Sequence, residues 1–317
     1  MILLVVAIAL SSTLLTHPLR QGRVDDSAHE AFRAIVDAYN AGGNVTSLVS
    51  KLNDALDLIS RADEVASEDP ELAHSLISQA NSTLTQILEE APEVAEEGRR
   101  RVFIGRVVLT SSAVAAAVVG VSAYIYGPRL FWRLWVRLRR RHRVRAVKVA
   151  RERGSMIISG EVWAVICAVL LVGAVFAVSQ YVRSKRVVEP FSALGVLGPN
   201  MKIGDYPSEV VAGETFRLYV YVLCYEGKPM LYTVYVKLGN ESTPINGTTP
   251  APLEPMYTLT HALMHNETWV TPIDVTLTEP GINYRLIFEL WAYDPETDSM
   301  VYTGRWCQLW LNVTAPP

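Results

Sequence analysis

The spacing of apolar residues changes its period along the chain and divides it into three kinds of segment. Over residues 26–97, apolar residues recur every three or four positions, as on one face of an amphipathic helix. Residues 107–126 and 162–182 carry no charged side chain. From residue 215 the period becomes two, which is typical of half-buried strands. The pattern predicts an α+β protein with N-terminal helices, two long apolar helices and a C-terminal β domain.

The N-terminal segment, residues 25–100, contains local signals for helix ends. Residues 44–46 open one helix, and Asp69 followed by Pro70 opens another, because Asp is a good N-cap and Pro suits the first helical position. The apolar stripe ends towards Gly98. We expect a helical hairpin, although the same stripe could form a coiled coil between chains and make the protein a homo-oligomer.

The two apolar segments predict transmembrane helices over residues 102–127 and 157–182. About 20 apolar residues, at a rise of about 1.5 Å each, cross a hydrocarbon core of roughly 30 Å. The loop between them, residues 128–155, is strongly basic, with 11 Lys and Arg side chains and one Glu over residues 129–154. Short basic loops remain cytoplasmic. We therefore expect a membrane protein with the loop inside the cell.

Both flanking segments are acidic, with 16 acidic and 3 basic side chains over residues 25–98 and 14 against 6 over residues 187–317. With the loop inside, residues 25–100 and 187–317 are both extracytoplasmic. Residues 1–20 are apolar and are expected to be either a signal peptide or a short N-terminal anchor.

The basic loop also suggests contacts with the lipid bilayer. Its side chains could bind nucleic acid or a signalling partner, but topology and attraction to anionic headgroups explain its position as well as its composition, so no nucleic acid is expected. The residues assigned to topology and lipid contact are Arg139, Arg140, Arg141, Arg143, Arg145, Trp132 and Trp135.

Asn-X-Ser/Thr sequons, in which X is not proline, occur only in the two acidic segments. This distribution agrees with the predicted topology, although the motif alone is weak. The glycosylation candidates are Asn44, Asn81, Asn240, Asn246, Asn266 and Asn312.

The C-terminal segment, residues 187–317, contains several short alternating stretches separated by Gly, Pro, Asn and Asp. These predict an immunoglobulin-like β-sandwich. Cys224 and Cys307 lie in two of the predicted strands and could form a disulfide between the sheets, or remain two buried thiols. Exposed aromatic residues of the strands are candidates for an interaction surface, namely Tyr219, Tyr221, Trp291, Trp306 and Trp310.

Catalytic chemistry is not evident in the sequence. His261 and His265 could share a metal only with a third ligand that the sequence does not supply. Residues 294–298 alternate acidic side chains as a calcium loop can, but Asp-Pro and Thr-Asp are also common in turns. Nucleophile-elbow, phosphate-loop and Cys-X-X-Cys motifs are missing. We expect no enzyme activity, no cofactor and no metal.

Four stretches resemble an archaeal membrane-protein family known as domain of unknown function 1616: VLGPNMKIGDYPSEVVAGE, YTVYVKLGN, YRLIFELWAYD and YTGRWCQLWLNVT. The resemblance covers residues 187–317. It implies an exported β domain on an archaeal membrane protein and brings no activity or catalytic residues.

These observations predict a membrane-anchored archaeal cell-envelope protein that presents a β-sandwich for binding or structural interaction with other cell-surface or membrane proteins. An alternative is an accessory subunit of a membrane enzyme or transporter complex, in which the small residues of the apolar helices make the main contact. A sensor that signals through the basic loop is a third hypothesis.

Overall fold

The structure is a computed structural model that describes residues 26–139, 168, 171–176, 178–179 and 189–316. The chain forms two compact units, one of Met1–Arg100 with Val187–Pro317 and one of Arg101–Arg186. The first unit contains the N-terminal helices and the β domain.

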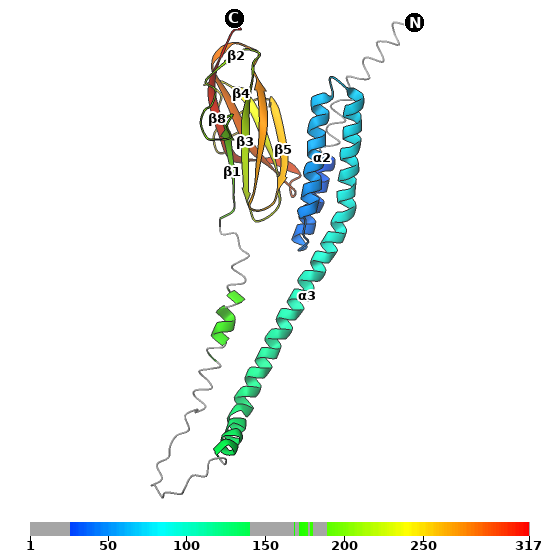
Figure 1. The fold of residues 1–317 in the computed structure, drawn as a ribbon, viewed down its shortest axis with the longest axis vertical. Helices are drawn as coiled ribbons and strands as arrows, with labels where there is room; N and C mark the ends of the chain where they lie inside the picture. Colours follow the sequence, from blue (N-terminus) through cyan, green and yellow to red (C-terminus); the bar gives the residue numbers. More distant parts are fainter. Residues whose placement is uncertain (1–25, 140–167, 169–170, 177, 180–188, 317) are drawn as a thin grey trace, which may run out of the picture. The chain divides into compact units, whose positions relative to one another are not determined.

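The N-terminal helices begin where the local signals predict. After a helix over residues 26–40 come α2 (Thr46–Val65) and α3 (Pro70–Arg139) (Figure 1). Asp69 caps α3, because its Oδ1 accepts a hydrogen bond from the backbone N of Leu72 at 3.1 Å. The helix starts at Thr46 and Pro70 are therefore confirmed.

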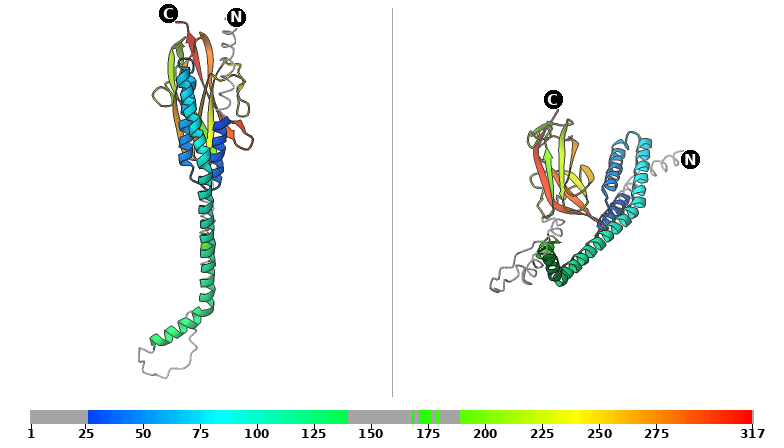
Figure 2. Two further views of the ribbon diagram at one scale, coloured as in Figure 1. Left: turned by 90° about the vertical axis from the view of Figure 1, so that its right-hand side faces the viewer. Right: turned by 60° about the horizontal axis from the view of Figure 1, so that its bottom comes forward.

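Helix 26–40, α2 and the N-terminal part of α3 run side by side (Figures 1 and 2). We call residues 26–100 the helical subdomain. Its core is formed by large side chains that are almost completely buried, namely Phe32, Ile35, Leu48, Leu52, Leu84 and Ile87.

The expected helix end towards Gly98 is wrong, because α3 continues without a break to Arg139. Gly98 serves packing instead. A Cβ atom at this position would collide with the backbone of Gly42 and Gly43, in the turn that follows helix 26–40. The glycine thus allows α3 to approach the turn closely, which local sequence does not reveal.

The β domain is a sandwich of two sheets with strand orders β1-β3-β6 and β2-β8-β7-β4-β5. The three-stranded sheet contains β1 (Phe191–Leu197), β3 (Thr215–Tyr225) and β6 (Glu267–Thr276). The five-stranded sheet contains β2 (Glu209–Val211), β4 (Met230–Gly239), β5 (Tyr257–Leu263), β7 (Gly281–Asp294) and β8 (Ser299–Thr314) (Figure 1).

This topology confirms the immunoglobulin-like sandwich. Strands pair antiparallel except β2, which runs parallel to β8, and the sheets divide the strands as in the two sheets of that fold. Alternate residues fill the core between the sheets, among them Val220, Val222, Val234, Phe288 and Leu290. The period-two pattern predicted β3, β4, the end of β6, β7 and β8, but not β1, β2 or β5.

The second unit contains the rest of α3 and residues 168–179 in part. Within the described residues, the structure has no helix whose length and hydropathy suffice to cross a membrane. Trp132, Trp135 and Arg139 fall within α3. Residues 1–20, with Arg140, Arg141, Arg143 and Arg145, lie outside the described residues.

Candidate interaction surface

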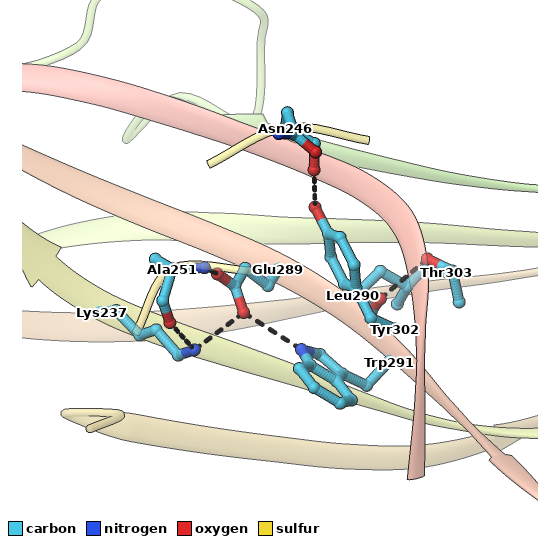
Figure 3. Close-up of polar contacts among 8 residues, drawn as sticks. All are labelled: Lys237, Asn246, Ala251, Glu289, Leu290, Trp291, Tyr302 and Thr303. Atoms are coloured by element: carbon cyan, nitrogen blue, oxygen red, sulfur yellow. Dashed lines mark hydrogen bonds and ion pairs between the residues drawn. The ribbon is translucent and has the colours of Figure 1, made fainter. Parts of the chain in front are cut away.

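A buried ion pair lies on the outer face of the five-stranded sheet (Figure 3). The Nζ of Lys237, on β4, is 2.9 Å from Oε2 of Glu289, on β7, and the side chains are only 7% and 0% exposed. Ala251 bridges the pair: its N donates to Glu289 Oε1 at 2.6 Å, and its O accepts from Lys237 Nζ at 2.8 Å. The Nε1 of Trp291 also donates to Glu289, at 3.1 Å. The pair thus fixes the β4–β5 connection, residues 240–256, on the sheet.

Aromatic rings surround this ion pair. The ring of Trp291 lies 5.6 Å from that of Tyr235, edge to face, and 5.6 Å from that of Tyr302. The hydroxyl of Tyr302 donates to the carbonyl of Asn246 at 3.0 Å (Figure 3). Burial, together with the charge of Glu289, raises the pKa of Tyr302 to about 12. Tyr302 therefore remains a neutral hydrogen-bond donor that helps to hold the loop.

Further along the same face, Arg285 of β7 lies between two tryptophans of β8. Its guanidinium carbon is 5.5 Å from the ring centres of both Trp306 and Trp310, within the range of a cation–π contact. Its Nε donates to Gln308, and its Nη1 donates to the carbonyl of Thr243 at 2.8 Å. Trp310 is 44% exposed. The stack holds a large apolar ring rigidly at the surface.

We call this surface the aromatic face and define it by Tyr235, Trp291, Tyr302, Trp306 and Trp310. Cross-strand pairing accounts for it, because Glu289 pairs with Trp306 and Arg285 with Trp310, and paired residues point to the same side of a sheet. Sequence analysis missed Arg285, Lys237, Glu289 and Tyr302. These residues alternate with core residues along β4, β7 and β8, and this alternation could have placed them on the outer face of the sheet.

The predicted interaction set does not form one surface. Trp291, Trp306 and Trp310 lie together on the aromatic face. Tyr219 and Tyr221 instead occupy outward-facing positions of β3, in the three-stranded sheet. There they pair with Pro272 and Val270 of β6. The two groups therefore occupy opposite outer faces of the sandwich.

The helical subdomain binds the sandwich through polar contacts between distant parts of the chain. Arg33 donates to the hydroxyl of Tyr293 at 2.9 Å, and Tyr293 donates to Asp298 at 2.6 Å. Arg33 also pairs with Asp298 at 2.5 Å. The ring of His29 stacks on Tyr293 at 4.2 Å, and burial lowers the pKa of this histidine, although nearby Asp298 opposes the shift. This cluster fastens helix 26–40 to β7 and the β7–β8 turn.

A second contact completes the edge strand β5. The Oδ1 of Asn53, on α2, accepts from the backbone N of Ala262 at 2.8 Å, and its Nδ2 donates to the backbone O of Ala262 at 2.9 Å. The side-chain amide thus takes the place of a neighbouring strand. Leu231, Ala262 and Tyr293 of the sandwich belong to the same buried cluster as the helices. The helical subdomain and the sandwich therefore share a core.

Of the two alternatives for Cys224 and Cys307, the structure shows two free thiols and no disulfide between them. Cys224 lies on β3 near Tyr232 of β4, which pairs with Ala292 of β7, whereas Cys307 pairs with Phe288 of β7. Four residues along a strand span about 13 Å, which is more than a disulfide can bridge. Burial raises the pKa of Cys224 and raises that of Cys307 to about 12.

The described residues contain no cluster of His, Cys, Asp or Glu suited to a metal ion. His261 stacks on Trp269 at 4.7 Å, while Nδ1 of His265 accepts from the backbone N of Gly227 at 3.1 Å. Each histidine therefore has its own structural contact.

The acidic run of residues 294–298 forms a turn. Asp294 accepts from the backbone N of Glu296 at 3.1 Å and from the hydroxyl of Thr297 at 2.8 Å. The hydrogen bond from Thr297 lowers the pKa of Asp294. These contacts agree with turn chemistry.

The fold and the surface define an α+β protein with an immunoglobulin-like domain and a helical subdomain packed on it. Residues 185–312 match the family described as Domain of unknown function (DUF1616), which confirms the family resemblance of the C-terminal part. No curated protein matches the chain.

Solved structures resemble the sandwich only remotely. The CARDB domain of the PF1109 protein of Pyrococcus furiosus, in complex with di-metal ions, is 14% identical, with a TM-score of 0.27 over 39% of this chain and 89% of that domain. A β-glucosidase from Listeria innocua is 13% identical, with a TM-score of 0.26 over 40% of this chain and 16% of the enzyme. A β-glucosidase from Erythrobacter marinus is 14% identical, with a TM-score of 0.24, covering 39% and 16%. Scores this low support no inference about function.

Proposed function

We propose that the chain is a non-enzymatic, membrane-anchored cell-envelope protein. Its helical subdomain and immunoglobulin-like domain stand together on the outer side of the membrane, where the aromatic face binds another surface component. The observation that carries this proposal is the core shared by residues 26–100 and 189–316.

That shared core constrains the topology. Arg33 and Asn53 precede both predicted membrane segments, whereas their partners Tyr293 and Ala262 follow both. Two regions that pack together in water must lie in the same compartment. A chain that enters the membrane after residue 100 must therefore cross it an even number of times before residue 189. This agrees with two crossings joined by a cytoplasmic basic loop.

Exposed apolar side chains of α3 support the membrane anchor. Phe103, Ile104, Val107, Val108 and Val114 are between 47% and 66% exposed. At about 100° per residue these positions fall within an arc of about 140° on one side of the helix. An exposed apolar face of this width is stable only when protein or lipid covers it, and the described part of the chain does not cover these residues.

The aromatic face supports a binding role because it presents Trp310 on a rigid scaffold. Tryptophan and arginine are enriched among the residues that dominate binding energy at interfaces. Arg285 is held by Gln308 and Thr243, so Trp310 loses little conformational freedom when a partner binds.

A labelling experiment tests the topology. The variants Asp54→Cys, Arg143→Cys and Glu279→Cys are treated with a membrane-impermeant maleimide in intact and permeabilised cells, in a Cys167→Ala background. The unsubstituted background is the control, because Cys224 and Cys307 are poorly reactive. We expect Asp54→Cys and Glu279→Cys to react in intact cells and Arg143→Cys only after permeabilisation. Labelling of Asp54→Cys and Glu279→Cys on opposite sides would refute the proposal.

A pull-down in mild detergent tests the binding face. Trp310→Ala should lose the stoichiometric partner, with a drop in affinity of about 30-fold for a loss of roughly 2 kcal/mol. Tyr221→Ala, on the opposite outer face, is the matched control and should retain it. If both variants retain a membrane enzyme or transporter, the contact lies in the membrane segments and the accessory-subunit hypothesis is favoured.

A further inference from the structure

The asparagine side chains of the six sequons make different local hydrogen bonds. In one arrangement, found at Asn246, the asparagine accepts bonds from the threonine of its own sequon. Its Oδ1 accepts hydrogen bonds from the backbone N and the hydroxyl of Thr248, both at 2.8 Å, and from the backbone N of Thr249 at 2.8 Å. The sequon is thus closed into an Asx turn by its own threonine. Asn246 is exposed in the β4–β5 connection.

Two other sequons have the same arrangement. Asn240 Oδ1 accepts from the backbone N of Ser242 at 3.0 Å and from its hydroxyl at 2.7 Å. Asn44 Oδ1 accepts from the backbone N of Thr46 at 3.3 Å and from its hydroxyl at 2.8 Å. Both asparagines are exposed and lie between elements of secondary structure. In all three sequons, the residue two positions after the asparagine makes both bonds.

The remaining sequons make other hydrogen bonds. Asn81 lies within α3, where the hydroxyl of Thr83 donates to the backbone O of Gln79 at 3.1 Å instead of to Asn81. Asn312 is half-buried in β8, and its Oδ1 accepts from the backbone N of Asn283 at 2.9 Å.

Asn266 is exposed in the turn between β5 and β6 with a φ of 65°. Its backbone N donates to the carbonyl of Cys224 at 2.7 Å. Within the described part of the chain, Thr268 makes no hydrogen bond to the Asn266 side chain. This sequon therefore lacks the closed turn.

We propose that Asn44, Asn240 and Asn246 are the N-glycosylation sites of the folded protein, and that Asn81, Asn266 and Asn312 are not. The substrate is a lipid-linked oligosaccharide. The bond from Nδ2 to the C1 atom of the sugar forms, the bond from C1 to the lipid phosphate breaks, and the phosphate leaves with the electron pair. One Nδ2 proton passes to a base of the transferase.

The closed turn favours this reaction in two ways. A carboxamide nitrogen is a weak nucleophile, and hydrogen bonds to Oδ1 stabilise the charge that develops when Nδ2 loses its proton, as in other activated nucleophiles. The same bonds fix the side chain in one conformation at an exposed site, which lowers the entropy that binding to the transferase must overcome.

Two of the three sites also lie beside the proposed binding face. Asn246 accepts the hydrogen bond of Tyr302 through its carbonyl (Figure 3), and the same connection holds Thr243 against Arg285. Glycans at Asn240 and Asn246 would therefore stand beside the aromatic face. Glycosylation in the cell rests on the proposed export of this domain, whereas the test below does not.

The experiment uses the purified full chain and its proteolytic peptides. Each is incubated with a lipid-linked oligosaccharide and an oligosaccharyltransferase that accepts Asn-X-Ser/Thr, and the initial rate at each asparagine is measured by mass spectrometry. A variant with Asn44→Gln, Asn240→Gln and Asn246→Gln is the matched control.

In the folded chain, we expect the three turn sites to react at least about tenfold faster than the others, a difference of about 1.4 kcal/mol in activation free energy. In the peptides, where the turns are lost, this preference should disappear, and the folded triple variant should be modified at least about tenfold more slowly than the unsubstituted chain. Comparable rates at Asn81, Asn266 or Asn312 in the folded chain would overturn the proposal. Failure of the three turn sites to react when their peptides do would also overturn it, whatever the topology experiment shows.

Discussion

The two hydrogen bonds between Asn53 and Ala262 allow a sharp test of how the helical subdomain holds the sandwich. Ala262 is fully buried, and both of its backbone groups bond to the side-chain amide of Asn53. In Asn53→Ala, one N–H and one C=O lose their partners in a site with little access to water. A buried group left without a partner costs about 1–3 kcal/mol. Because water can enter part of the gap, we expect the free energy of local opening at Ala262 to fall by about 2–4 kcal/mol in total.

Hydrogen exchange at the amide of Ala262 measures this loss locally. Since each 1.4 kcal/mol is a factor of ten, exchange should accelerate by roughly 30- to 1,000-fold. Amides in the centre of β7 should change much less, because β4 and β8 still flank that strand.

Asp54→Ala is the matched control. Asp54 is exposed on the same helix, and Asp and Asn have similar helix propensities, so both changes to Ala affect the helix alike. Unchanged exchange at Ala262 in Asn53→Ala, or equal acceleration in Asp54→Ala, would refute the assignment of Asn53 as the partner of the edge strand.

Three further predictions concern the sandwich and its contact with the helices. Lys237→Met should lower the unfolding free energy by about 3–5 kcal/mol by leaving Glu289 charged and buried, and adding Glu289→Gln should restore much of it; denaturant titration measures both. Cys224 and Cys307 should resist alkylation in the native protein at pH 8. Both should react once the protein is unfolded without reductant, whereas resistance after unfolding would indicate a disulfide. The lowered pKa of His29 means that the unfolded chain binds more protons, so stability should fall as pH drops from about 6.5 towards the folded pKa; His29→Gln should flatten that part of the curve.

Features set by local chemistry could be predicted from the sequence. Asp69 and Pro70 mark the start of α3 because capping depends on neighbouring residues. The alternation in β7 and β8 placed these strands because their inner faces fill the core. The role of Gly98 could not be predicted, since its reason is the turn at Gly42 and Gly43, far away in the sequence.

The candidate surface was predicted only in part for the same reason. Its tryptophans were identifiable as candidate exposed aromatic residues, but the separation of Tyr219 and Tyr221 from them, on the opposite outer face, depends on which strands share a sheet. Asn53 and Ala262 are separated by 209 positions, and no local pattern connects an amide on a helix with an edge strand. β5 was overlooked, although His261 is a packed strand residue whose ring stacks on Trp269.

The core shared by the helical subdomain and the sandwich has a consequence for proteolysis. Because Arg33, Asn53 and Tyr39 bind residues of the sandwich without any covalent link, a single cut between residues 140 and 186 would yield two fragments that remain associated. The nicked protein would keep its sandwich in place until a denaturant separated the fragments. The two halves could likewise be produced as separate polypeptides and assembled afterwards.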